Sequence, residues 1–404
     1  MRGAGGSLSI WVLVDALGWE LLRGRRFLDD VLPYRRWLVT VLGYSSAAIP
    51  TLLTGRWPSE HGHWNLFCLA REAAPFAWAR PLGRLPRALV ENRLGRWLVA
   101  RLARRLSGYT GYFSIYAYPI ATLPYFDLSE KRDIYRPGGL ACPSLFDRLA
   151  AHGIPYEAYT YRGHTDAEIL ALAPRRAAEA PIRVLFLYLS GLDHYLHFHV
   201  HDREGVTARL AWYEAGLRRL WRAAVGARDE VRMFVFSDHG MTPVRWTYDL
   251  RRDVAGLGLR VPDDYLAAYD STMARFWARS DRARRRLEEL LGDHPCGRLL
   301  ARDELERLGV WFADDRYYQL LFLLRPGVLL CPSDMSAVRF AGMHGFHPSD
   351  PTADAVLLSS VPVPGGVDHI VHVHDVLAAD LGLAAGAPPA APADPRRRAR
   401  EVAA

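Results

Sequence analysis

Three short apolar runs, each with an aspartate at or near its end, constrain most strongly what this chain can fold into. They are SIWVLVD, RVLFLYLSGLD and RMFVFSDHG, which contain Asp15, Asp193 and Asp238. Continuous apolar runs of this length are typical of strands buried on both faces of a parallel sheet. Helical patterns lie between them, for instance the one that starts at Arg203. The sequence therefore predicts an α/β, three-layer fold with a mostly parallel central sheet flanked by helices.

Two regions interrupt this alternation, one over about 64–139 and one over about 245–325. The first is rich in arginine and aromatic residues. The second has a mainly helical pattern, in which SDRARRRLEELLGD is the clearest helix. We expect both to be insertions that form a lid or wall over the sheet, or else a separate cap domain. The runs QLLFLLRPGVLLCPSD and AVLLSSVPV then predict a return to the alternation. One domain is expected over 1–383, followed by an Ala/Pro-rich and then charged tail over 384–404 that is predicted to be disordered.

Composition narrows the class of protein. No apolar run reaches the roughly 18 to 20 residues of a membrane span, and the first run has the features of a buried strand rather than of a signal peptide. The four cysteines show no metal or redox spacing, which predicts a reduced, cytoplasmic protein. The net charge is +7, but Lys131 is the only lysine. Because such a bias towards arginine is typical of a GC-rich genome, the charge is weak evidence, and no nucleic-acid polymer is expected as a partner.

The three aspartates have histidines close by in the sequence. Because ligands collect beyond the carboxyl ends of parallel strands, we expect the aspartates to meet there. His197 lies four residues after Asp193 and shares its face on a helical turn, His239 follows Asp238, and His344 stands in GMHGFHP. Carboxylates together with neutral imidazoles suit zinc or manganese. Each residue alone has an ordinary structural explanation, but together they indicate a metal site. His194, His199 and His201 of the same run are assigned to no metal.

The stretch LGYSSAAIPTLLTGRWPSEHG places two serines, Ser45 and Ser46, ahead of small apolar residues and a Thr-Gly turn. A hydroxyl at the start of a helix often satisfies free backbone groups. It can also be a nucleophile held where free N–H groups attract an anionic substrate. From the residues alone both interpretations stay open.

The order Asp15, Ser45, Asp193/His197, Asp238/His239, His344 resembles the alkaline phosphatase superfamily, and in particular its nucleotide pyrophosphatase/type I phosphodiesterase branch. TLLTGRWPSEHG is similar to the stretch downstream of that branch's nucleophile, and GMHGFHPSDP to its last metal-histidine motif. The resemblance spans residues 10–360 but is dense only around these motifs.

This resemblance implies a role for each residue. The family's nucleophile lies nine residues before the Thr of the Thr-Gly turn, here Thr54, which selects Ser45 and leaves Ser46 as the alternative; the branch usually has a threonine there. The resemblance implies two divalent metals, with zinc expected first and manganese second. Asn65 is the candidate donor to a phosphoryl oxygen, although it lies one residue closer to the His-Gly pair than in relatives. The implied ligands are Asp15, Ser45, Asp238 and His239 for one metal, and Asp193, His197 and His344 for the other.

The function that the resemblance implies is metal-dependent hydrolysis of a phosphodiester or pyrophosphate bond through a phosphoseryl intermediate. The alternative is a phosphomonoesterase or phosphomutase of the same superfamily. A sulfatase is disfavoured, because its signature requires Pro two residues and Arg four residues after the nucleophile. From Ser45 those positions hold Ala47 and Ile49, and from Ser46 they hold Ala48 and Pro50.

The expected substrate is a phosphate-ester small molecule or a lipid- or glycan-linked phosphate. A diester is favoured over a monoester because no arginine directly follows Ser45 to neutralise an extra charge. Tyrosines of the first insertion are candidates for an apolar wall, or for core positions: Tyr109, Tyr112, Tyr116, Tyr118 and Tyr125.

Residues 80–106 suggest a different class of function, a membrane-associated anion-binding module with weak catalysis. Eight arginines stand there against one acid, Glu91, and the apolar residues fall at near-helical spacing: Leu85, Leu89, Leu94, Trp97, Leu98 and Leu102. A basic amphipathic helix with a Trp is typical of peripheral membrane contact. A lid helix with a solvated arginine face is the alternative, and it is the one that the sequence favours.

Overall fold

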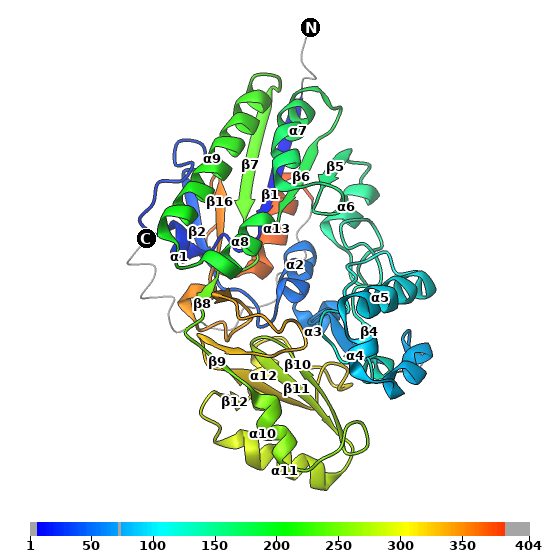
Figure 1. Cartoon of the computed structure of the whole chain (residues 1–404). Helices are drawn as coiled ribbons and strands as arrows, with labels where there is room; N and C mark the ends of the chain where they lie inside the picture. Colours follow the sequence, from blue (N-terminus) through cyan, green and yellow to red (C-terminus); the bar gives the residue numbers. More distant parts are fainter. Residues whose placement is uncertain (1–5, 72–73, 384–404) are drawn as a thin grey trace.

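The computed structural model describes residues 6–71 and 74–383, so the predicted disordered tail lies outside the described residues. A six-stranded sheet forms its centre, with the strand order β2-β16-β7-β1-β6-β5 (Figure 1). β1 runs parallel to β6 and β7, and β5 runs parallel to β6, whereas β16 is antiparallel to both of its neighbours. The strands are β1 (Ser7–Val14), β2 (Tyr34–Leu38), β5 (Tyr156–Tyr159), β6 (Val184–Leu189), β7 (Glu230–Phe236) and β16 (Ala355–Ser359).

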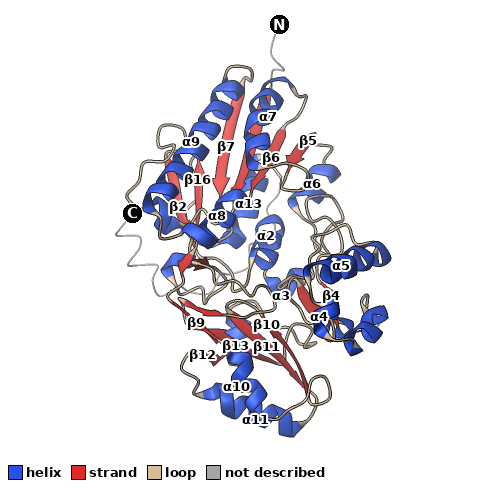
Figure 2. Ribbon diagram, in the orientation of Figure 1, coloured by secondary structure: helices blue, strands red, loops and turns tan. Residues whose placement is uncertain are grey.

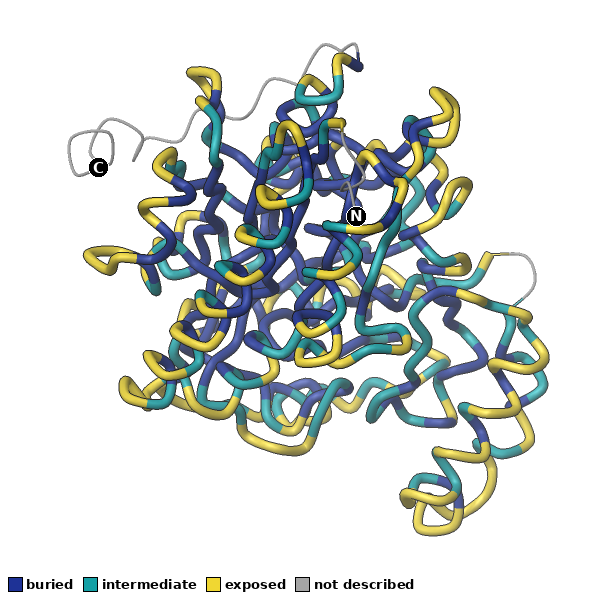
Figure 3. The backbone as a smooth tube through the Cα atoms, turned by 90° about the horizontal axis from the view of Figure 1, so that it is seen from above, coloured by how far each residue is buried: buried dark blue, intermediate teal, exposed yellow. Residues whose placement is uncertain are grey.

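Helices cover both faces of this sheet, which confirms the three-layer prediction (Figure 2). Alternate residues of β1 enter two different cores. Ile10 and Val12 pack with α7 (Asp166–Glu179) and α9 (Arg203–Val225). Trp11 and Leu13 belong to the opposite core, which holds α2 (Ser45–Thr54), α6 (Leu145–Ala151) and α13 (Val373–Asp380). Buried segments gather at the centre of the molecule in Figure 3, and exposed ones lie at turns and outer helices.

The second insertion contains a sheet of its own, so the expectation of a mainly helical segment was wrong. Four antiparallel strands in the order β10-β11-β13-β12 carry α10 (Leu250–Gly256) and α11 (Asp281–Gly292) against one face. The strands are β10 (Tyr265–Tyr269), β11 (Met273–Ala278), β12 (Gly297–Leu299) and β13 (Leu320–Leu324). The remaining helix, α12 (Arg302–Arg307), buries Leu305 in the core that holds α2. The run expected to rejoin the central sheet at 319–334 instead gives β13 and β14 (Val328–Leu330), which pairs with β9 (Trp246–Tyr248).

The first insertion is built around a short two-stranded antiparallel sheet and one longer helix. Its elements are β3 (Phe67–Leu69), η1 (Ala77–Arg84), α4 (Arg87–Val90), α5 (Arg93–Ser107), η2 (Leu123–Tyr125) and β4 (Phe126–Leu128). Its aromatic core includes Leu266 and Trp277 of the second sheet, so the two insertions pack against each other.

Short elements complete the chain. They are α1 (Trp19–Leu22), α3 (Pro58–His61), α8 (Gly191–His199), β8 (Thr242–Pro243), β15 (Gly342–Met343), η3 (Pro351–Ala353) and η4 (Ile370–His372). In the stretches that the structure describes, no helix is both long and apolar enough to cross a lipid bilayer.

Candidate active site

Three neighbouring parallel strands deliver the three aspartates to one edge of the central sheet. Asp15 follows the last residue of β1, and Asp238 follows β7 by two residues. Asp193 lies in the first turn of α8, which begins two residues after β6. Because β1 pairs in parallel with both β6 and β7, the three carboxyl ends lie side by side. Asp15 and Asp238 are buried.

One triad forms between α8 and the turn after β15. His197 Nε2 lies 3.2 Å from Asp193 Oδ2, at the predicted four-residue spacing. His344 Nε2 lies 3.6 Å from the other oxygen of the same carboxylate. Single ligand atoms from the three residues all lie within 4.8 Å of one another, as one metal ion requires.

The second triad combines the ends of β1 and β7. His239 Nε2 lies 3.1 Å from Asp238 Oδ2 and 3.4 Å from Asp15 Oδ1, and this group meets the same 4.8 Å criterion. The His239 ring stacks on the His344 ring with centroids 3.7 Å apart. The two triads therefore adjoin, and their membership is the one that the resemblance implied.

The two serines at the start of α2 have different partners. Ser45 Oγ lies 3.0 Å from His239 Nε2, beside the second triad. Ser46 Oγ donates instead to the backbone carbonyl of Trp64, 3.0 Å away. Because the first N–H groups of a helix lack intrahelical partners, the start of α2 offers donors to an anion held at Ser45.

Backbone carbonyls fix two of the imidazoles. His197 Nδ1 lies 2.9 Å from the carbonyl of Gly342, and His239 Nδ1 lies 2.8 Å from that of Gly240. A carbonyl only accepts, so each Nδ1 carries a proton and donates, which leaves Nε2 to face the carboxylates. This tautomer is the one in which Nε2 ligates a metal.

Burial and mutual charge set the ionisation of the site. Burial, together with the charges of Asp238 and Asp193, raises the pKa of Asp15 well above its usual range. Burial lowers the pKa of His239, but the neighbouring charges of Asp238 and Asp15 outweigh it and raise that pKa to about 10. His344 has no such excess of carboxylates, and burial and the His239 charge lower its pKa well below the usual value.

The donor set fits two divalent cations. Among the described residues, the three carboxylates form ion pairs with imidazoles only. Oδ1 of Asp15 and Oδ1 of Asp193 are buried without a hydrogen bond. A buried carboxylate oxygen without a donor is costly unless a cation satisfies it, and mixed oxygen and imidazole ligands suit zinc or manganese.

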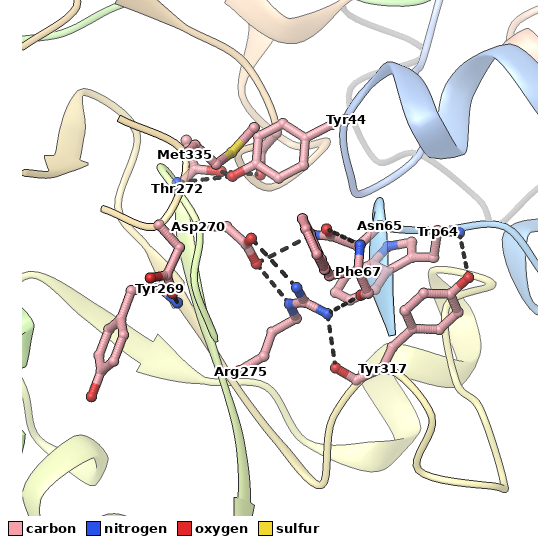
Figure 4. Close-up of polar contacts among 12 residues, drawn as sticks. Tyr44, Trp64, Asn65, Phe67, Tyr269, Asp270, Thr272, Arg275, Tyr317 and Met335 are labelled. Atoms are coloured by element: carbon pink, nitrogen blue, oxygen red, sulfur yellow. Dashed lines mark hydrogen bonds and ion pairs between the residues drawn. The ribbon is translucent and has the colours of Figure 1, made fainter. Parts of the chain in front are cut away.

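The structure brings Asn65 into a different cluster from the seven metal-ligand candidates. Its Nδ2 donates to Asp270 Oδ2 at 3.2 Å, next to the buried pair Asp270–Arg275 (Figure 4). Its Oδ1 lies 3.4 Å from the N–H of Phe67. The role of Asn65 as a donor to a phosphoryl oxygen therefore stays a prediction. His194, His199 and His201 are exposed and belong to neither triad.

Sequence reasoning missed two tyrosines that contact members of the triads, Tyr188 and Tyr44. The Tyr188 hydroxyl donates to Asp15 from within β6. Tyr44, directly before Ser45, hydrogen-bonds Thr272 of the second insertion at 2.9 Å and packs edge-on against His344. Tyr188 carries a weak sequence signal, a polar group near the end of an apolar strand.

This chain is similar to known proteins both in sequence and in fold. A model of the family described as type I phosphodiesterase / nucleotide pyrophosphatase matches residues 34–347. Murine ectonucleotide pyrophosphatase / phosphodiesterase 5 is similar in structure, with a TM-score of 0.64 and 16% identity over 95% of this chain and 98% of that chain. The human protein of the same name gives 0.64 and 14% over 95% and 97%. A search of the curated proteins found no match. Because the family match covers well over half of the chain, this protein belongs to the type I phosphodiesterase / nucleotide pyrophosphatase family of the alkaline phosphatase superfamily, and it is a hydrolase.

Proposed function

We propose that this protein hydrolyses a phosphodiester or pyrophosphate bond through a phosphoseryl intermediate on Ser45, with two divalent cations held by the two triads. The observation that carries the proposal is the 3.0 Å contact of Ser45 Oγ with His239 Nε2, where the two triads adjoin. When bound, the cations would activate the serine and neutralise phosphoryl charge. Zinc is the first choice from the donor set, and manganese is the second.

Several residues of this chain would position the phosphoryl group and the side chains that hold the cations. Ser45 Oγ would lose its proton to solvent and form the bond to phosphorus, while the ester oxygen on the opposite side leaves with its electron pair and takes up a proton. Water would then hydrolyse the phosphoserine, which restores the serine hydroxyl and releases the phosphate product. The start of α2 presents backbone donors to the phosphoryl oxygens. Tyr188 orients Asp15, and the carbonyls of Gly342 and Gly240 hold two imidazoles in their ligating tautomers.

A diester is the favoured substrate. A monoester carries an additional negative charge near neutral pH, and an enzyme selective for it needs a further cation near the phosphoryl group. No arginine or lysine among the described residues pairs with the three carboxylates of the site. Tyr112 and Tyr116 hydrogen-bond each other at 2.8 Å and are candidates for an apolar wall against the second substituent of a diester. Tyr118 is instead part of the buried Asp270 cluster.

The experiment is an activity panel on chelator-treated protein resupplied with zinc or manganese. We expect the highest kcat/KM with bis-(p-nitrophenyl) phosphate, a lower value with p-nitrophenyl phosphate and none with p-nitrocatechol sulfate. A clear preference for the monoester would favour the phosphomonoesterase alternative. Full activity of the chelated protein without added metal would exclude the two-cation proposal.

Metal content provides a readout that is independent of turnover. The wild-type protein should bind two cations per chain after equilibrium dialysis, as measured by atomic emission. Asp238→Asn should weaken the site beside Ser45, and His344→Ala should weaken the other. Two cations retained at full affinity in both variants would show that these residues are not ligands.

We also propose a cytoplasmic location. All four cysteines are free thiols, which persist in a reducing compartment. Fractionation of cells that produce the protein would test this, and recovery only from an extracellular fraction would contradict it.

A further inference from the structure

Helix α5 exposes its large apolar side chains and buries small ones, which is the reverse of what a helix packed only against its own protein would do. The side chains that it buries are the small or branched Val99 and Ala103. Four leucines, Leu94, Leu98, Leu102 and Leu106, recur every fourth residue and are 43 to 65% exposed. A four-residue spacing places them along one face. A lid helix with only a solvated arginine face, which the sequence favoured, would have turned these leucines inward.

The exposed leucines belong to a larger apolar surface. Fourteen large apolar side chains are exposed among the described residues, and half of them lie between positions 85 and 106. We call these seven the α4–α5 surface: Leu85, Leu89, Leu94, Trp97, Leu98, Leu102 and Leu106. Helices α4 and α5 lie at the outer edge of the molecule in Figure 1. Contiguous exposed apolar surface of this kind marks an interaction site.

Arginines border this surface, and seven of them are exposed: Arg80, Arg84, Arg87, Arg93, Arg101, Arg104 and Arg105. The guanidinium of Arg101 lies 5.5 Å from the centre of the Trp97 ring, on the helix surface. The nearby acid Glu91 is already paired with the half-buried Arg96 at 3.5 Å. The α4–α5 surface therefore presents leucines and a tryptophan together with uncompensated positive charge.

The α4–α5 surface is linked to the triads through a series of tyrosine contacts. Arg96 donates to the backbone carbonyls of Tyr116 and Tyr118 at 3.2 and 2.7 Å. Tyr116 bonds Tyr112, whose ring packs on Tyr161, and Tyr161 packs on Tyr188, the partner of Asp15. A contiguous set of tyrosines thus lies between the helix and the metal triads.

We propose that the α4–α5 surface docks on an anionic lipid bilayer, with its leucines and Trp97 at the headgroup boundary and its arginines beside lipid phosphates. An amphipathic helix with this distribution binds in the plane of the interface. A second copy of the chain is a poorer occupant, because a two-fold interface brings the same arginines of both copies together. Docking does not depend on the catalytic proposal, since none of these residues belongs to the triads.

The experiment is flotation of the full-length protein with vesicles of phosphatidylcholine alone or mixed with phosphatidylglycerol. We expect binding to the mixed vesicles that falls as salt increases. Trp97→Ser should weaken binding about tenfold, because the ring supplies apolar area to the interface. Its matched control, Trp246→Ser, removes a tryptophan that is 56% exposed on β9, and should bind like the wild type.

A second pair of variants tests the charge. Arg104→Glu with Arg105→Glu should abolish flotation, whereas Arg282→Glu with Arg285→Glu, on the exposed face of α11, should leave it unchanged. The hydrolytic rate on a soluble diester should be the same for all four variants. Equal binding to neutral and anionic vesicles, or equal losses in test and control variants, would overturn the proposal. A dimer in light scattering that Trp97→Ser abolishes, without vesicle binding, would assign the surface to a second copy instead.

Discussion

At the residue scale, the adjacent serines Ser45 and Ser46 are proposed to have different roles, one as the nucleophile and one as a structural hydrogen-bond donor. Ser45 points to His239 and the triads, whereas Ser46 bonds the carbonyl of Trp64. Both occupy the first turn of the same helix, so the difference arises from the direction of each side chain. The hydroxyl that we propose as the nucleophile is the one that lies beside the second triad.

Removing these hydroxyls one at a time tests the assignment. Ser45→Ala should lower kcat by about 10³-fold or more, because a nucleophile is lost. The two cations should remain bound, since six other ligands hold them. Ser46→Ala should keep most activity and lose only a hydrogen bond worth about 1 kcal/mol of stability. Steady-state kinetics with metal analysis checks both; a dispensable Ser45 and an essential Ser46 would reverse the assignment.

A second prediction at this scale concerns pH and a buried histidine, His369, that belongs to neither triad. Burial and the charge of His372 lower the pKa of His369 to about 3. The folded state therefore prefers the neutral ring, and this stability is present above the usual pKa near 6.5 and is lost as pH falls towards 3. The expected loss is about 1.4 kcal/mol for each pH unit between about 6 and 4.

His369→Asn should flatten this acid slope. His369 Nδ1 accepts from the N–H of Val371 at 3.2 Å, and an asparagine oxygen can take over that bond. Denaturant titrations at a series of pH values measure the slope. His152→Asn, at an exposed histidine, is the control and should keep the wild-type slope. An unchanged slope in His369→Asn would refute the assignment.

The members of the two triads could be anticipated from the sequence through strand-end aspartates, the four-residue spacing of Asp193 and His197, and the family resemblance. Their supporting residues could not. Tyr44 and Thr272 are 228 positions apart, and Tyr188 and Asp15 are 173 apart. Only the tertiary fold brings such pairs together. Asn65 shows a second limit of sequence reasoning: its place in a motif does not determine the direction of its side-chain amide, which donates to Asp270.

At the element scale, the strands of the second insertion escaped the periodicity analysis for a physical reason. β11 is buried on both faces, because Phe276 enters one core and Trp277 enters another. Such a strand shows no alternation, and at six residues it is too short to distinguish from a buried helix turn. The exposed amphipathic helix α11 in the same region, by contrast, was predicted correctly.

The C-terminal end of α2 offers a test at this scale. Gly55 ends α2 with φ at 63°, and an added Cβ would lie 2.9 Å from Nδ1 of His374. Gly24 has a similar φ of 69° with nothing within 4 Å. Gly24→Ala should cost about 1 kcal/mol from backbone strain alone. Gly55→Ala should cost about 2 kcal/mol or more, because steric overlap adds to the same strain. Chemical denaturation compares them, and equal costs would show that His374 moves freely.

At the scale of the whole molecule, a buried ion pair joins the two insertions. Arg275 Nε lies 2.6 Å from Asp270 Oδ2, and Arg275 Nη1 donates to the Phe67 carbonyl at 2.7 Å (Figure 4). Arg275 Nη2 lies 3.0 Å from the Tyr118 hydroxyl. Phe67 and Tyr118 belong to the first insertion, and Asp270 and Arg275 to the second. Sequence reasoning proposed two insertions along the chain but could not show that their residues share a core.

Breaking this pair should destabilise the protein strongly. Arg275→Met leaves the Asp270 carboxylate buried without its partner, at an expected cost of about 3 to 5 kcal/mol. The double variant Arg275→Met with Asp270→Asn should recover part of that loss, because no uncompensated charge remains. Thermal and denaturant unfolding measure both. A double variant less stable than Arg275→Met alone would show that the hydrogen bonds matter more than the charge.

The same pair limits how the protein can move. Many enzymes admit substrate by opening a hinge between the pieces that cover the site. Here the two insertions are held together by the hydrogen bonds of Arg275 to Phe67 and Tyr118 and by a shared aromatic core. Tyr44 ties the second insertion to the residue before Ser45 as well. The two insertions should therefore travel as one rigid body, and any gate for entering substrate and departing product must be sought in side chains and loops at the rim.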